Sequence, residues 1–273
     1  MPPFTDTPPH VEKIVAECYR RMPSARKWKL MGDAYRYGRH LHAAGMRSRN
    51  PGIADEDIQR NWVLSTLGDG PWISRMRFSM QNQPAEHQEV IRHVIEAFGQ
   101  EGIGYAIGGS LASSYHGYLR YTQGADISAE PFAGKERAFA ARFDAADYYS
   151  DVAMIQDAIQ RRASFNLVHL ATGFKVDVFI RKDRPFDMAF WLRRQSSTDF
   201  DSTGKSVEVI SPEDVILLKL EWYRMGGEQS DRQWNDILGV LRTQTDKLND
   251  RYLDVWAAEL GVSDLLARAR RDA

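Results

Sequence analysis

Apolar residues recur every three to four positions along much of this chain, a spacing typical of helices with one buried face. Near the N-terminus the pattern predicts helices over 10–22, 24–47 and 55–67, and Ser24 and Asp55 are the expected N-caps of the second and third. Periodicity and capping signals predict further helices at 85–99, 134–143, 151–161, 185–191, 212–225, 231–241, 250–260 and 264–271.

Short apolar runs between these helices predict strands at 105–107, 165–170, 175–180 and 207–210. Thr172-Gly173 lies between two of the runs and indicates a hairpin. Residues 107–130 have the pattern of a buried strand, a Gly-Gly-Ser turn, a short helix and a second strand that carries a carboxylate. The expected fold class is therefore α/β, with a small mixed sheet flanked by helices.

Residues 68–84 contain two Gly- and Pro-bearing stretches and are expected to form a linker. The predicted domains are a helical N-terminal unit at 1–80, an α/β core at 81–210 and a C-terminal helical bundle at 211–273. The N-terminal unit has a thin apolar core of its own, so it is expected to pack on something else. It either completes the core or regulates it.

Composition narrows the class of protein. The chain has 273 residues, of which 43% are apolar and 27% charged, as in ordinary globular proteins. No apolar run reaches the length of a membrane span, and the N-terminus lacks the pattern of a signal peptide. The single cysteine, Cys18, excludes an internal disulfide. A cytoplasmic protein with no membrane partner is expected.

Positive charge is concentrated in residues 20–49, which contain nine Lys or Arg and one acid, Asp33. This segment has a balance of +8 against −1 for the whole chain, so the remaining residues carry about −9. Such asymmetry is found on surfaces that bind nucleic acid or acidic partners, and also on solvated helix faces. Both alternatives stay open.

The residues that can carry chemistry are a phosphate-type turn and two strand carboxylates. Gly108-Gly109-Ser110 lies where a strand meets a helix, a place where backbone amides can approach phosphate. Asp126 and Asp177 lie among apolar residues on strands, where a carboxylate needs a metal or a partner. The alternative for these two is an edge strand facing water, or a salt bridge to Arg120 or Lys175.

Several spaced elements share one pattern, namely Gly108-Gly109-Ser110, His116-Gly117, Arg120, Thr122, Asp126, and then Asp177 within 174–179. The pattern resembles the nucleotidyltransferase-fold superfamily, especially its bacterial toxin-like and uncharacterised branches. The resemblance covers roughly residues 85–270. It implies metal-dependent transfer of a nucleoside monophosphate from a nucleoside triphosphate to an acceptor, with Mg²⁺ or Mn²⁺ as the cofactor.

The resemblance also implies roles for individual residues. Asp126 and Asp177 would be catalytic metal ligands, and Lys219 would be a catalytic lysine that holds the triphosphate. The implied nucleotide-binding residues are Gly108, Gly109, Ser110, Arg120, Asp231 and Asp236, of which Asp231 and Asp236 would orient the lysine or the substrate. The residues themselves leave alternatives: Arg120 has a structural role, Lys219 extends outward to solvent, and Asp231 stabilises a helix dipole.

This chain departs from the family at Gly124, where the first strand carboxylate is expected. Glu130 has the same strand parity as Asp126 but lies about 13 Å further along the strand, so it is a poor replacement. The chain is therefore either an enzyme, active or weakened, or a non-catalytic member that binds a nucleotide or a partner. RNA, a protein or a small molecule is the expected acceptor, with RNA favoured by the basic segment, and the toxin-like resemblance implies a neutralising partner protein.

Overall fold

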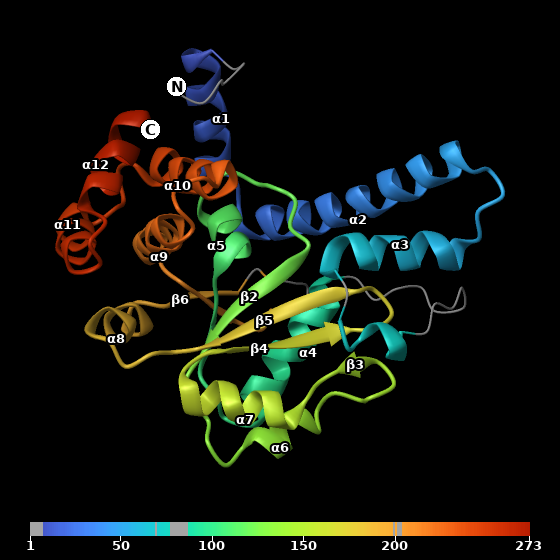
Figure 1. Cartoon of the computed structure of the whole chain (residues 1–273). Helices are drawn as coiled ribbons and strands as arrows, with labels where there is room; N and C mark the ends of the chain where they lie inside the picture. The colour runs from blue at the N-terminus through green and yellow to red at the C-terminus, as the bar shows by residue number, and fades with distance from the viewer. Residues whose placement is uncertain (1–7, 69, 77–86, 199, 201–203) are drawn as a thin grey trace. The chain divides into compact units, whose positions relative to one another are not determined.

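The structure is a computed structural model of the whole chain, and it describes residues 8–68, 70–76, 87–198, 200 and 204–273 (Figure 1). Most of the linker expected at 68–84 and the Pro-rich start of the chain lie outside the described residues. Within the described part, none of the helices combines the length and the apolar character that a membrane span requires.

The described helices are α1 (Pro9–Arg21), α2 (Ser24–Arg49), α3 (Asp55–Leu67), the short 3₁₀ helix η1 (Ile73–Arg75), α4 (His87–Gln100), α5 (Gly109–His116), α6 (Glu136–Ala140), α7 (Val152–Arg161), α8 (Pro185–Leu192), α9 (Pro212–Met225), α10 (Asp231–Gln244), α11 (Asp250–Glu259) and α12 (Ser263–Asp272). The strands are β1 (Tyr105–Ile107), β2 (Gly124–Ala129), β3 (Tyr148–Tyr149), β4 (Ser164–His169), β5 (Phe174–Ile180), β6 (Gln195–Ser197) and β7 (Val207–Val209).

Two of the expected N-caps are wrong. Ser24 and Asp55 are the first residues of α2 and α3, and Ala54 is the N-cap of α3. The Asp55 carboxylate instead accepts a hydrogen bond from Arg47, with 2.6 Å between Oδ1 and the guanidinium nitrogen. By contrast, Ser211 and Ser230 cap α9 and α10 by accepting from the backbone amides of Asp214 and Gln233.

The described strands form one mixed sheet, in the order β3-β4-β5-β2-β1-β7-β6. β2 pairs with β5, and β1 with β7, in parallel, whereas β4 and β5 form the antiparallel hairpin that Thr172-Gly173 predicts. The expected α/β class with a small mixed sheet is therefore confirmed.

The chain divides into two compact units, each assembled from separate stretches. Unit 1 contains residues 1–29, 107–120 and 183–273, and unit 2 contains residues 30–106 and 121–182. The chain crosses from unit 2 to unit 1 within β1, between Ala106 and Ile107. The three consecutive domains expected from the sequence stay a prediction.

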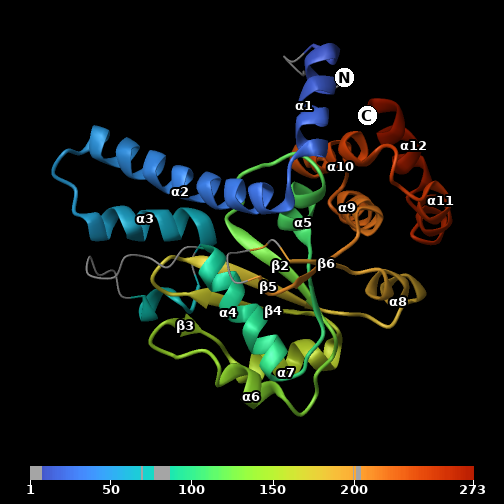
Figure 2. The same cartoon turned by 180° about the vertical axis from the view of Figure 1, so that it is seen from behind.

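The core of unit 2 lies against one face of its strands. Phe98 of α4 stacks on Phe139 of α6 there, with ring centroids 4.7 Å apart, and Phe139 meets Phe165 of β4 edge to face at 6.1 Å. Figures 1 and 2 show α4, α6 and α7 together on that side of the strands. Alternation along β2 buries Ala125, Ile127 and Ala129, so the residues between them face the opposite side.

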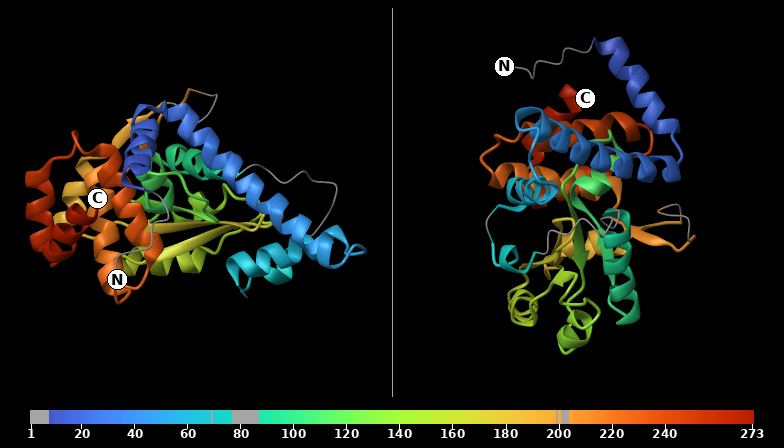
Figure 3. Two further views of the ribbon diagram at one scale, coloured as in Figure 1. Left: turned by 90° about the horizontal axis from the view of Figure 1, so that it is seen from above. Right: turned by 90° about the vertical axis from the view of Figure 1, so that its right-hand side faces the viewer.

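Unit 1 is built around α5, α9 and α10, which contact one another. They can be followed in the view from above in Figure 3. α1 joins them through Arg20, whose guanidinium donates to the carbonyl oxygens of Thr243 and Arg242 at 3.2 and 3.0 Å. At the end of α5 the buried His116 ring bonds to the Ile210 carbonyl, with 2.7 Å from Nε2 to the oxygen. His116 therefore has a packing role.

Two buried histidines predict acid sensitivity. Burial lowers the pKa of His87 and of His116 from 6.5 to about 4. Between those pH values the unfolded chain binds protons that the folded chain does not, so stability falls as pH drops from 6.5 towards 4. The expected loss is about 3 kcal/mol for each histidine. Urea denaturation at pH 7, 5.5 and 4.5 measures it.

His87→Phe isolates one of the two contributions, because the ring lies against Tyr35 and Phe174, at centroid distances of 5.1 and 5.9 Å. In this variant the number of protons taken up on unfolding between pH 6.5 and 4 should fall by up to about one. The exposed His40→Gln is the matched control and should reproduce the wild-type profile. An unchanged profile in His87→Phe would contradict the prediction.

Candidate active site

The Gly-Gly-Ser turn joins β1 to α5 in unit 1. Gly108 is the N-cap of α5 and has no side chain with which to cap the helix. Gly109, the first helical residue, has a φ of +52°, which a residue with a Cβ adopts only under strain. Ser110 follows and is buried. No side chain of the N-cap residue caps the first amides of α5. These backbone amides can therefore bind an anion at the start of the helix.

Lys219, Asp236 and Arg120 form an ion cluster in unit 1. Lys219 lies on α9 and Asp236 on α10, and 2.7 Å separates Nζ from Oδ2. Arg120, a few residues beyond α5, donates from Nε to the other carboxylate oxygen at 2.8 Å. Each oxygen of Asp236 therefore accepts from one cation, and the Lys219–Asp236–Arg120 cluster carries a formal charge of +1.

Burial makes this cluster more than a surface ion pair. The side chains of Asp236 and Lys219 are 4% and 11% exposed, whereas that of Arg120 is 31% exposed. The cluster thus has a dry end at the lysine and a wetter end at the arginine. The alternative in which Lys219 extends outward to solvent is excluded, because its ammonium is held by the buried carboxylate.

Asp231 does not join this cluster. It is the exposed first residue of α10, and five residues of helix rotate it by about 140° from Asp236. Its position at the positive end of the helix suits the dipole role that the sequence left open.

The two strand carboxylates meet in unit 2. Asp126 of β2 and Asp177 of β5 are direct register partners on parallel strands. Adjacent strands lie about 4.8 Å apart, so the two side chains leave the same face of the sheet as neighbours. Both are half-buried, and both lie between buried apolar residues of their strands. We call Asp126 and Asp177 the carboxylate pair.

Lys175 belongs to the same face as the carboxylate pair. Its ammonium lies 3.0 Å from Oδ2 of Asp177, so the salt bridge that the sequence left open is present. Its register partner on β2 is Gly124. Glu130, dismissed as a replacement carboxylate, lies beyond β2 and accepts a hydrogen bond from the Gly104 amide at 2.7 Å.

Asn166 was not predicted from the sequence as a site residue. It is the register partner of Asp177 on β4, so Asn166, Asp177 and Asp126 follow one another across three strands. The signal was available, because Asn166 stands between the apolar residues Phe165 and Leu167 of a predicted strand. Its face, however, depends on the register of the hairpin, which the sequence pattern alone did not define.

The donor set suits one divalent ion rather than two. Mg²⁺ and Mn²⁺ prefer oxygen ligands, and Mg²⁺ is often held by one or two carboxylates together with substrate phosphates. The carboxylate pair supplies those two groups. Among the described residues no group of three or more His, Cys, Asp or Glu side chains is arranged to hold a metal. A bridge between two ions would require further carboxylates.

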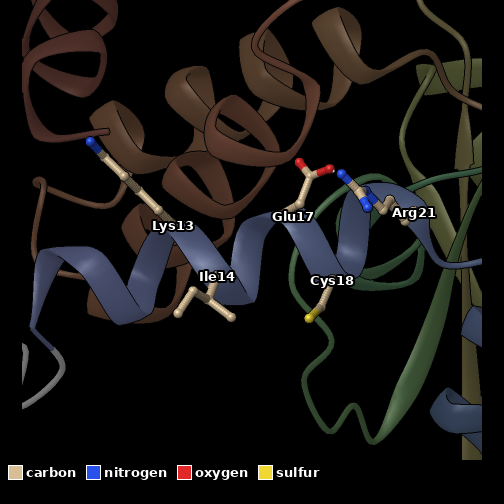
Figure 4. Close-up of a pocket in the computed structure, with 5 residues that line it drawn as sticks. All are labelled: Lys13, Ile14, Glu17, Cys18 and Arg21. Carbon is tan, nitrogen blue, oxygen red and sulfur yellow. The ribbon is translucent and has the colours of Figure 1, made fainter.

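A shallow hollow of about 350 Å³ lies elsewhere, along α1. It is lined by Lys13, Ile14, Glu17, Cys18 and Arg21. Figure 4 shows the aliphatic Ile14 and the Cys18 thiol on one side of the helix and the charged side chains on the other. All five residues come from one helix, and none is a candidate site residue, so this hollow is not the site.

Many charges of the basic segment 20–49 are already engaged. Lys27 is buried and donates to the Tyr115 carbonyl at 2.8 Å, and burial lowers its pKa to about 8. At least four further cations of the segment pair with carboxylates: Arg20 and Arg21 with Glu17, Arg36 with Asp33, and Arg47 with Asp55. The excess of +8 is therefore not a freely available cationic face.

No family model and no curated protein sequence matches the chain. Similar solved structures include the antibiotic-resistance factor ANT(2'')-Ia in solution, at 12% identity and a TM-score of 0.39, over 67% of this chain and 96% of that one. A crystal structure of ANT(2'')-Ia with adenylyl-2''-tobramycin aligns at 13% identity and a TM-score of 0.43, over 64% and 96%.

An antigenic nucleotidyltransferase-like protein from Paracoccidioides brasiliensis aligns at 16% identity and a TM-score of 0.41, over 69% of this chain and 94% of that one. All three structures resemble this chain only weakly. At such identities and TM-scores they say nothing about what this chain binds or transfers.

Proposed function

We propose that this chain is a nucleotidyltransferase that moves a nucleoside monophosphate from a nucleoside triphosphate to an acceptor hydroxyl. The observation that carries the proposal is the carboxylate pair, in which Asp126 and Asp177 are direct partners on adjacent parallel strands. Two neighbouring half-buried carboxylates repel one another unless a cation lies between or beside them. Even with the Lys175 ammonium at Asp177 the three groups sum to −1, so the pair still suits a divalent ion that carries the triphosphate.

Each group of residues has a role in this proposal. Asp126 and Asp177 would hold a divalent ion, which when bound neutralises phosphate charge and polarises the reacting oxygens. The amides at Gly109 and Ser110 would bind phosphate oxygens. Lys219 and Arg120, oriented by Asp236, would supply positive charge for the triphosphate. Catalysis would then consist of positioning and charge stabilisation.

The test is transfer of label from each α-labelled nucleoside triphosphate, with Mg²⁺ or Mn²⁺, to pools of RNA, protein and small-molecule acceptors. The wild type should label one class of acceptor. Asp126→Asn and Asp177→Asn should each lower the rate at least about 100-fold, because each removes a charged ligand of the divalent ion that would act on the phosphates.

Asp157→Asn is the matched control for these variants. Asp157 lies on α7, where it pairs with Arg161, and its side chain is 55% exposed. This variant should transfer at the wild-type rate. Equilibrium dialysis with each nucleotide accompanies the assay. A folded wild type that neither binds a nucleoside triphosphate nor labels any acceptor would overturn the proposal.

A second candidate function is nucleotide binding without transfer. It is favoured by Gly124, which leaves the carboxylate pair without a third carboxylate, and by the Lys175 ammonium on Asp177. Binding that depends on Asp126 and Asp177, with no labelled acceptor even in Mn²⁺, would identify this function. A neutralising partner protein remains part of the expectation from the toxin-like resemblance.

A further inference from the structure

We propose that Lys175 is the resident cation of the carboxylate pair, and that a divalent ion has to displace its ammonium in order to bind. The inference deepens the proposed function, because it concerns how the same two carboxylates take up their metal. In this arrangement the pair holds one cation at a time, either the lysine or a single metal ion.

The first support is the geometry on β5. Lys175 and Asp177 are two residues apart on one strand, so their side chains leave the same face. The ammonium lies 3.0 Å from Oδ2 of Asp177, and the two side chains are 33% and 24% exposed. The ammonium thus occupies a ligand position of the carboxylate that the register places next to Asp126.

The second support is the charge of this face. With Lys175 in place, a third carboxylate at position 124 would give the face a charge of −2 and would attract a second divalent ion. With Gly124 and Lys175 as neighbours, Asp126, Asp177 and Lys175 instead sum to −1. The lysine therefore reduces the repulsion within the pair when no metal is bound, as an opposite charge at this distance does.

The third support is the close approach of the two strands at this point. A Cβ on Gly124 would lie 2.7 Å from the Lys175 carbonyl oxygen and 3.9 Å from the Lys175 Cβ. The glycine permits this approach, and the lysine stem adjoins the space where a side chain at 124 would begin. The close approach of the two strands thus disfavours a carboxylate at position 124, and the residue opposite, Lys175, carries a positive charge.

The expected gain in Mn²⁺ affinity follows from the exposed fractions of the Lys175 and Asp177 side chains. A salt bridge whose partners are about one-third and one-quarter exposed contributes little net stability, so a divalent ion can displace the ammonium. Removing the ammonium should nevertheless remove a competitor. We expect Mn²⁺ to bind about 3- to 10-fold more tightly to Lys175→Met than to the wild type, because the methionine keeps the stem without the charge.

The experiment titrates the full chain with Mn²⁺ and follows free Mn²⁺ by electron paramagnetic resonance, without nucleotide. Lys182→Met is the matched control, since Lys182 is exposed beyond the end of β5 and its loss changes the net charge by the same amount. Wild type and Lys182→Met should have equal affinities, and Lys175→Met a higher one. Equal affinity in all three, or no Mn²⁺ binding in any, would overturn the inference.

Two further measurements keep this result separate from folding and from catalysis. Thermal melting without metal should show a lower Tm for Lys175→Met than for Lys182→Met, and added Mn²⁺ should raise the Tm of Lys175→Met more than that of the wild type. These readouts require no turnover, so transfer could fail while the inference holds, and the reverse.

Discussion

Replacing Asp236 with alanine should destabilise the folded chain by about 3–5 kcal/mol, because it leaves the buried ammonium of Lys219 without its partner. The carboxylate is 4% exposed and accepts from two cations, so water cannot easily take its place. Urea denaturation measures the change. The buried Trp234, two residues earlier on α10, is positioned to report unfolding of unit 1 by fluorescence.

Two companion variants show whether the loss comes from the cluster. Asp231→Ala removes an exposed carboxylate from the same helix and should cost less than about 1 kcal/mol, the loss of a dipole interaction. Lys219→Met combined with Asp236→Leu removes both partners and should recover most of the lost stability. If Asp236→Ala costs no more than Asp231→Ala, the cluster does not hold the lysine in the way described.

Local chemistry in the sequence was sufficient to predict most helices. α9 opens with Ser211 as a cap and Pro212 in its first turn, and α10 opens with Ser230, so each start is marked by side chains that satisfy free amides. The N-cap predictions for Ser24 and Asp55 were wrong because Ser and Asp also occur as the first residue within a helix. Asp55 is the first residue of α3, and its carboxylate pairs with Arg47 and does not cap the helix.

Short strands and register could not be predicted in the same way. β3 has two residues and β6 has three, so neither is long enough to show an alternating pattern, and each exists because a neighbouring strand pairs with it. Asn166 was missed for a related reason. Its face of the sheet follows from pairing with β5, and the sequence carries that information only indirectly.

The candidate site was predictable in its residue types and not in its contacts. Lys219 stood out as a lysine on the apolar side of a helix, but its partner Asp236 is 17 residues away on another helix. Arg120 is 116 residues from the same carboxylate. The resemblance implied that Asp236 orients the lysine, but packing between distant segments decides such contacts, and the sequence did not place Arg120 on the same carboxylate.

The Gly124→Asp variant should lower the stability of the chain and should not raise any transfer activity. From the sequence alone, Gly124 is a missing carboxylate that aspartate would restore. In the structure a Cβ there would lie 2.7 Å from the Lys175 carbonyl oxygen, a backbone atom that cannot rotate away. The two paired strands would have to move apart, at an expected cost of about 1–3 kcal/mol. Thermal or urea denaturation and the labelled-nucleotide assay measure the two effects.

Gly124→Ala separates the steric effect from the charge, because it adds the same Cβ without a carboxylate. If the close approach to Lys175 decides the outcome, both variants should lose similar stability, and both should disturb the register that makes Asp126 and Asp177 neighbours. A Gly124→Asp protein that is as stable as the wild type and transfers nucleotide faster would contradict this prediction. The missing carboxylate would then be the only defect of the site, and the fit of Gly124 against Lys175 would be incidental.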